Sequence, residues 1–154
     1  MAQVDDFLAE MLPRWQRAYR ALCGGDVEPW AAIWSTRDPV SLFGAAGSAS
    51  GTEEVRRVQG WVAGHFAGLV DEKQELIATG ASGDLAYTVA FEHKTVDTPG
   101  GGRATYTLRT THVFRREDGE WRIVHRHGDR PPERDDFPIA PAPRSGRADV
   151  EEPT

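Results

Sequence analysis

The second half of the chain alternates between apolar and polar residues, and this period of two restricts it to β-structure. Four segments carry the pattern, at residues 73–81, 84–96, 104–116 and 121–129. The runs that separate them, "SGD", "TPGGG" and "EDGE", have the composition of hairpin turns. The sequence therefore predicts four antiparallel strands joined by hairpins.

The first half has the pattern of helices that pack on such a sheet. Residues 4–22 place apolar side chains three and four apart, although Pro13 predicts a kink or a later helix start. A short helix is predicted over 27–34, and a third helix begins at the N-cap Thr52. Between them we expect a strand at 38–44 and a loop of small residues at 45–51. Helices followed by a meander predict an α+β domain with the helices on one sheet face.

Composition narrows the class of protein further. A chain of 154 residues with a net charge of −6 suits one domain and argues against nucleic acid or an anionic membrane as partner. The single cysteine excludes an internal disulfide, and neither a secretory signal nor a long apolar segment is present, so we expect a cytoplasmic protein. Residues 132–154 are rich in proline and charge. We expect one domain over 1–131 and a disordered tail beyond it.

Hairpin geometry predicts which side chains share a face of the sheet. With Asp118-Gly119 in the last turn, Arg116 faces Trp121, and the register then sets His112 beside His125. The preceding hairpin is expected to close with Thr98 facing Arg103. The predicted inner face, beneath the helices, then comprises Tyr87, Val89, Phe91, His93, Tyr106, Leu108, Thr110, His112, Phe114, Ile123, His125 and His127. Four of the five histidines fall on this face.

This group of histidines indicates a cavity. A buried imidazole needs a hydrogen-bond partner, and any one of these histidines is explained by such a partner in the core. Four of them together with Thr110 and two tyrosines favour a cavity with polar lining. On the opposite, outer face, Glu92 and Arg109 are predicted to pair across strands.

Several of these segments resemble the nuclear transport factor 2-like superfamily, and in particular its SnoaL-like domains. The resemblance covers about residues 5–130 and rests on the helix stripe, "GD" before a tryptophan-rich short helix, "GTEEV", and the closing "LRTTHVFRREDGEWRIVHRH". The ending is also similar to the association domain of calcium/calmodulin-dependent kinase II. The resemblance implies a cone-shaped, curved antiparallel sheet wrapped by three N-terminal helices, with a pocket inside and an outer face that forms a homodimer.

Ketosteroid isomerases, which share this fold, provide positions for comparison. Their general-base aspartate corresponds to Leu42, so the resemblance argues against steroid isomerisation. Their oxyanion-binding tyrosine falls near Ala18, beside Tyr19, and their protonated aspartate corresponds to His112. In the kinase association domain the position of His112 is a pocket arginine. Both resemblances imply that this position lies inside the cavity.

Two functions remain open, an enzyme and a ligand-binding or assembly module. A lyase or isomerase without a cofactor would use histidine acid–base chemistry on an apolar, oxygen-bearing substrate, and a binder would hold the same small hydrophobic molecule unchanged. The candidate catalytic residues are His112, His125 and Tyr19. The candidate ligand-binding residues are Trp15, Trp34, Phe43, Trp61, Phe91, His93, Tyr106, Thr110 and His127.

The histidines and the single cysteine also raise the questions of a metal site and a reactive thiol. His112, His125 and His127 are predicted to lie near one another, but no third convergent ligand or carboxylate accompanies them, so we expect no metal. Cys23 has no basic neighbour in the sequence that would activate its thiol, and we expect it to be a packing residue.

Overall fold

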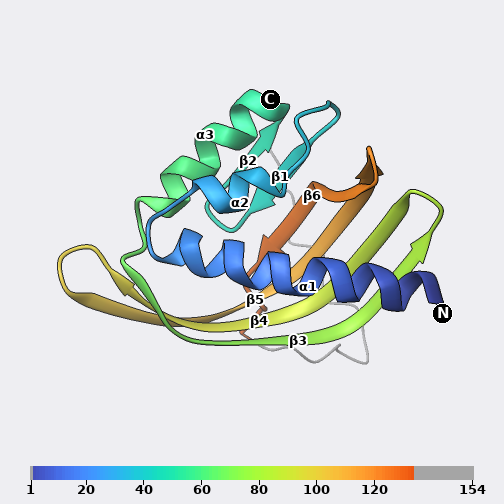
Figure 1. Cartoon of the computed structure of the whole chain (residues 1–154). Coiled ribbons are helices and arrows are strands. Elements are labelled where there is room, and N and C mark those ends of the chain that lie inside the picture. The colour runs from blue at the N-terminus through green and yellow to red at the C-terminus, as the bar shows by residue number, and fades with distance from the viewer. Residues whose placement is uncertain (1, 134–154) are drawn as a thin grey trace, which may run out of the picture.

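The computed structural model describes residues 2–133, and the predicted tail from residue 134 onward lies outside the described residues. A six-stranded curved sheet forms one layer, with strand order β2-β1-β6-β5-β4-β3 (Figure 1). The helices are α1 (Ala2–Cys23), α2 (Glu28–Ala32) and α3 (Thr52–Ala63). The strands are β1 (Ser41–Gly44), β2 (Gly47–Ser50), β3 (Gly68–Ser82), β4 (Leu85–Thr98), β5 (Gly102–Glu117) and β6 (Glu120–Asp129).

The predicted α+β architecture is confirmed, with three differences in detail. The sheet is mixed, because β1 pairs with β6 in parallel while the other pairs are antiparallel. The predicted loop at 45–51 contains β2, which folds back on β1. The first helix begins at Ala2 and runs through Pro13, so the later start is wrong. No helix within the described residues combines the length and apolarity that crossing a membrane requires.

The core lies between α1 and one face of the sheet, which we call the inner face (Figure 1). The apolar stripe of α1 places Phe7 against Phe114 and Trp121, with ring centroids 4.9 and 5.2 Å away in edge-to-face geometry. Such aromatic pairs add to the stabilisation from burial alone. This contact fixes the N-terminal half of α1 over β5 and β6. The C-terminal half of α1 then lies above the part of the sheet that contains the buried charges of Glu92, Lys94 and Arg126.

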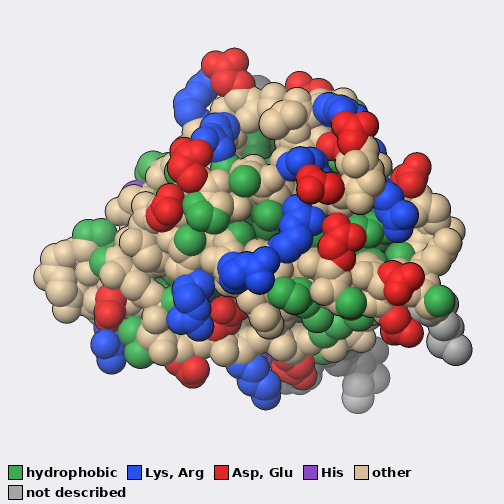
Figure 2. Space-filling model, in the orientation of Figure 1, with side chains coloured by type: hydrophobic (Ala, Val, Ile, Leu, Met, Phe, Trp, Pro, Cys, Tyr) green, Lys and Arg blue, Asp and Glu red, His purple; other side chains and the backbone are tan. Residues whose placement is uncertain are grey.

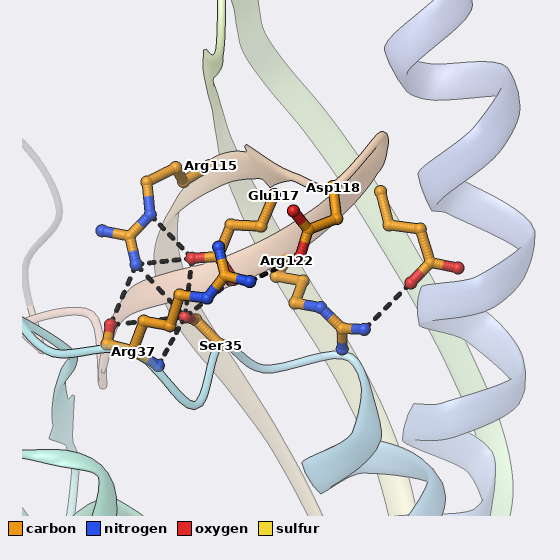
Figure 3. Close-up of polar contacts among 7 residues, drawn as sticks. Ser35, Arg37, Arg115, Glu117, Asp118 and Arg122 are labelled. Atoms are coloured by element: carbon orange, nitrogen blue, oxygen red, sulfur yellow. Dashed lines mark hydrogen bonds and ion pairs between the residues drawn. The ribbon is translucent and has the colours of Figure 1, made fainter.

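A hydrogen-bonded cluster ties the β5–β6 turn to the segment between α2 and β1 (Figure 3). The Ser35 hydroxyl contacts both carboxylate oxygens of Glu117, at 2.9 and 2.8 Å. Arg115 donates to Glu117 and to the carbonyl of Arg37 at 2.8 and 2.9 Å. Burial opposes ionisation of Glu117, but its hydrogen bonds with Arg115 and Ser35 hold the pKa of this carboxyl below its ordinary value. The cluster holds the β5–β6 turn in place and thereby fixes the start of β6.

A bulge in β6 reverses the face of its second half. Phe114 pairs with Ile123, as predicted, but Val113 pairs with His125, so β6 contains one extra residue at Val124. A residue inserted on one strand shifts every later side chain to the opposite face. Arg126 therefore lies opposite His112, where His125 was expected.

The register of β4 also differs from the prediction by one residue. Thr98 pairs with Gly102 and not with Arg103, so Thr88 lies opposite His112 where Val89 was expected. The inner positions of β4 are Ala86, Thr88, Ala90, Glu92, Lys94 and Val96, all buried. The small residues at the start of this series leave room for the helix layer. The larger apolar residues between them lie on the outer face, contrary to the prediction.

Candidate small-molecule pocket

A pocket of about 370 Å³ lies over the inner face, next to the charged part of the sheet. Its walls come from α1, α2, α3, the β1–β2 turn and strands β4, β5 and β6. Most of the lining is apolar, and this part includes Leu22, Trp30, Leu42, Ala45, Ala46, Val58, Trp61, Val62, Phe66 and Leu108. Size and lining are those of a site for a small organic molecule.

Buried charges lie at the sheet side of the pocket. Arg126 binds Glu92 through two nearly parallel contacts, Nη1 to Oε1 at 2.8 Å and Nη2 to Oε2 at 2.9 Å. The side chain of Glu92 is 0% exposed and that of Arg126 10%. The hydroxyl of Tyr19 donates to the same carboxylate at 3.4 Å. A paired arrangement of this kind is what permits a carboxylate to remain in the interior.

Lys94 completes the cluster and has a longer contact with the Glu92 carboxylate than Arg126 has. Its Nζ lies 3.5 Å from Glu92 Oε2, an oxygen that Arg126 already contacts at 2.9 Å. The ammonium group also lies 4.1 Å from the ring centroid of Tyr19 and 5.3 Å from that of Tyr106. Burial, together with the positive charge of Arg126, lowers the pKa of Lys94 well below its ordinary value. A lysine in this environment is able to act as a base or to bind an anion.

His112 is hydrogen-bonded to Arg126 and does not line the pocket. Its Nε2 lies 2.9 Å from Arg126 Nη1, so the imidazole accepts a hydrogen bond through this nitrogen. Burial and the neighbouring Arg126 lower the pKa of His112 well below its ordinary value. The ring is therefore neutral near pH 7, and it positions the guanidinium. Edge-to-face contacts with Trp15 and Trp30, at 6.0 and 6.4 Å, hold it in place.

Several predicted site residues do lie in or beside the pocket. Tyr19, Trp61 and Tyr106 line it. Trp15 is buried and stacks on Tyr19 at 4.5 Å, so it supports the wall. Trp34 and Thr110 are buried on the helix side of the sheet, and Thr110 donates to the carbonyl of Ala90 at 3.3 Å. The ligand-binding roles of these residues stay predictions.

The predicted histidine cluster is wrong. His125 and His127 lie on the outer face with Phe43, at ring distances of 5.3 and 5.7 Å from it, because the bulge at Val124 reverses their direction. Phe91 and His93 lie on the outer face because of the one-residue shift in β4. These five residues were expected inside, and none of them lines the pocket.

The same correction separates the three histidines considered for a metal. His112 faces the helices, whereas His125 and His127 face away from them, so the sheet lies between them. Within residues 2–133, no group of three or more His, Cys, Asp or Glu side chains is placed to hold a metal ion. Cys23 is buried, and burial with the nearby Glu72 and Glu92 raises its thiol pKa to about 12. It is a thiol at neutral pH.

The residues that the sequence prediction missed are Glu92, Lys94 and Arg126. The predicted hairpin register places all three on the outer face of the sheet, opposite to the face that carries His112. A signal was nevertheless present, since one parity of β4 combines an acidic and a basic residue with small alanines and valine. Two opposite charges at alternate positions among small residues fit a buried pair beneath a helix.

Comparisons with known proteins agree with this architecture. The family model of the SnoaL-like domain matches residues 13–131. A candidate dehydratase of the NTF2-like family from Streptomyces avermitilis superposes with a TM-score of 0.66 at 21% identity, over 82% of this chain and 97% of that one. An NTF2-like superfamily protein from Salmonella enterica gives 0.60 at 18% identity, over 86% and 89%.

A third structure, a candidate calcium/calmodulin-dependent kinase II association domain from Xanthomonas campestris, gives a TM-score of 0.60 at 17% identity, covering 82% and 86% of the two chains. Identities at this level establish a shared fold and say nothing about activity. The sequence has no significant match among curated proteins. Because the family model covers the second half of α1, the other two helices, the whole sheet and the pocket, the chain belongs to the SnoaL-like domain family.

Proposed function

We propose that the chain binds an apolar small molecule whose polar oxygen lies against Lys94 and Arg126. The observation that supports this most strongly is the buried Glu92–Arg126–Lys94 cluster beside an otherwise apolar pocket. Burying three ionisable groups costs stability, and perturbed groups of this kind concentrate at functional sites. A carbonyl or oxyanion of a ligand would accept hydrogen bonds that these cations still have available.

Binding is testable with a neutral ketone of suitable size, 2-tetralone. Trp30 and Trp61 line the pocket, so their fluorescence reports occupancy. Val62→Phe places a larger side chain in the pocket wall and should abolish binding. Val70→Phe is the matched control, because Val70 is 46% exposed and does not line the pocket. Equal binding by both variants, with both folded by circular dichroism, would contradict the proposal.

A second candidate function is proton transfer of the lyase or isomerase type, with Lys94 as the base where histidines were expected. The lowered pKa of Lys94 favours it, because its amine gives up its proton more readily than an ordinary lysine and is then able to accept one. The amine would take a proton from the carbon next to a ketone, Arg126 would stabilise the enolate oxygen, and the proton would return to carbon or be exchanged. Against it stands Leu42, an apolar residue of the pocket wall where the resembling ketosteroid isomerases have their base.

Deuterium incorporation into 2-tetralone in D2O distinguishes an enzyme from a binder. The chain has two lysines, and Lys73 is exposed on β3, which makes Lys73→Met the matched control for Lys94→Met. An enzyme should accelerate exchange over buffer in the wild type and in Lys73→Met but not in Lys94→Met. Binding without accelerated exchange identifies a non-catalytic module.

We also propose that the outer face of the sheet forms a homodimer. Leu85, Tyr87 and Phe43 are 56%, 45% and 45% exposed there. Exposed apolar side chains gathered on one face are typical of an interface. The predicted pair Glu92–Arg109 has no part in it, since Glu92 is buried inside and Arg109 binds Asp129 at 2.9 Å. Sedimentation should show a dimer that Tyr87→Glu dissociates, and a monomeric wild type would contradict the proposal.

A further inference from the structure

The basic side chains of the pocket have no acidic counterpart in its lining. Lys94, Arg126 and Arg130 contribute to the wall, and among the described residues no aspartate or glutamate does. This is unexpected for a chain with 24 acidic and 18 basic residues. On the helix side of the molecule acidic and basic side chains alternate (Figure 2). The pocket is thus a local region of positive charge in an acidic protein.

The ion pairs around the pocket hold Arg126 more closely than Lys94. Glu92 contacts both Arg126 and Lys94, but its two oxygens bind Arg126 at 2.8 and 2.9 Å and leave Lys94 at 3.5 Å. Glu72 lies opposite Lys94 on β3, where burial raises the pKa of its carboxyl, and it lines the neighbouring groove with Arg17 and Arg20 and not this pocket. Two buried basic side chains therefore share the Glu92 carboxylate, and Lys94 is the one with the longer contact.

Arg130 extends the positive region along the pocket wall. Its guanidinium carbon lies 5.8 Å from the ring centroid of Tyr106, the same ring that Lys94 Nζ approaches at 5.3 Å. Within residues 2–133, no carboxylate pairs with Arg130. Lys94 and Arg130 therefore both lie beside one aromatic ring of the wall, and a ligand group placed there meets both charges.

We infer that the ligand of this pocket is an organic monoanion, an apolar body with one carboxylate that lies beside Lys94, Arg126 and Arg130. The inference rests on the proposed ligand-binding function and names the ligand class. The apolar lining and the volume of about 370 Å³ accommodate an aromatic or branched aliphatic body. One carboxylate supplies a negative charge beside Lys94 and accepts the hydrogen bonds that Lys94 and the remaining N–H groups of Arg126 donate. The bound carboxylate favours the protonated form of Lys94 and so offsets the burial and the Arg126 charge that lower its pKa in the free protein.

The test compares 2-naphthoate with 2-naphthamide, which has the same shape and no charge. Titrations followed by the fluorescence of Trp30 and Trp61 should give at least about tenfold tighter binding of the acid, the size expected for a charge-assisted contact. Lys94→Met and Arg130→Gln should each reduce this acid-to-amide ratio, and Lys94→Met should bring it near one. Their matched controls are Lys73→Met and Arg103→Gln, at positions outside the pocket, and both should keep the wild-type ratio.

The outcomes separate the two levels of the proposal. Equal binding of acid and amide overturns the monoanion and leaves the binding function in place, whereas binding of neither, and of no 2-tetralone, overturns both. Displacement of 2-naphthoate by millimolar inorganic phosphate would also overturn the inference, because it would identify a site for a small multivalent anion with no use for the apolar walls. An unchanged ratio in a folded Lys94→Met variant would remove Lys94 from the site.

Discussion

The inner and outer faces of β4 differ in which side chains are buried: the inner face buries charged residues, and the outer face exposes apolar ones. On the inner face, Glu92 and Lys94 are 0% and 2% exposed in their side chains and are held by Arg126 and the tyrosines. On the outer face, Tyr87 is 45% exposed, and Phe91 and His93 are half-buried. The more hydrophobic face of this strand is thus the one in contact with solvent.

This contrast shows that a side chain of β4 is buried when the helix layer covers its face of the sheet. The hydrophobicity of the side chain alone does not determine its burial. Helix α1 requires small residues beneath it, which Ala86 and Ala90 provide. Of the charges that follow them, Glu92 is hydrogen-bonded to Arg126, and Lys94 lies 3.5 Å from the same carboxylate and beside the rings of Tyr19 and Tyr106. If this is correct, substitutions on the inner face should be costly in stability, and equivalent ones on the outer face should not.

The largest difference is expected between two arginines that each bind a carboxylate. Arg126→Met leaves Glu92 buried without its main partner and should lower the free energy of unfolding by about 3–5 kcal/mol. Arg109→Met breaks the exposed pair with Asp129 and should cost less than about 1 kcal/mol. Urea denaturation measures both.

A double variant shows whether the unpaired charge is the cause. Glu92→Gln combined with Arg126→Met removes the buried negative charge together with its partner and should recover much of the loss. A loss of similar size from Arg126→Met and Arg109→Met would contradict the assignment of the two faces.

A smaller difference is expected between two histidines. His112→Ala removes a fully buried ring and the hydrogen-bond acceptor of Arg126, and it should cost about 2–4 kcal/mol. His127→Ala removes an exposed ring and should change stability by less than about 0.5 kcal/mol. Thermal unfolding of the two variants at pH 7.5 makes the comparison, and a more severe effect at His127 would contradict the bulge at Val124.

The dependence of stability on pH should report the burial of His112. The pKa of His112 is lowered from 6.5 in the folded protein by burial, then by Arg126, His125 and Lys94. Below pH 6.5 the unfolded chain therefore binds a proton that the folded chain does not, so stability falls as the pH decreases. His112 should contribute about 1.4 kcal/mol per pH unit in this range. His112→Gln should flatten the dependence of the unfolding free energy on pH between pH 6.5 and 5, and an unchanged slope in this variant would contradict the buried, neutral ring of His112.

The fold follows from the sequence more readily than the site. The period of two, the turns and the stripe of α1 predict the elements, and the last hairpin has the predicted register as far as Ile123. Beyond that residue the prediction fails, because a single extra residue in β6 has no distinct signature among "RIVHRHG". The hairpin containing "TPGGG" allows more than one closure, and a one-residue difference there reversed β4.

The site was missed as a consequence of these two shifts. Arg126 and Glu92 reach each other only when β4 and β6 both have their observed faces, so the pattern of β4 alone does not identify Arg126 as the partner of Glu92. His112 was placed correctly inside because its strand contains no irregularity. Its role differs from the prediction, since its contact with Arg126 makes it a positioning residue.

The protonation of Lys94 tests the central claim most directly. Lysine labelled with ¹³C at Cε gives separate NMR signals for Lys73 and Lys94, the two lysines of the chain. Lys94 faces Glu92 on its own strand, Glu72 on β3, Tyr106 and His112 on β5, Arg126 on β6 and Tyr19 on α1.

In the free protein the Lys94 signal should titrate well below the ordinary lysine pKa, because burial and Arg126 lower its pKa. Addition of 2-naphthoate should move the Lys94 titration to higher pH, while 2-naphthamide leaves it in place. A bound carboxylate raises this pKa, so binding takes up a proton and weakens as the pH rises above the free-state pKa. A Lys94 signal that titrates at the ordinary lysine pKa in the free protein, or one unaffected by bound 2-naphthoate, would contradict the account.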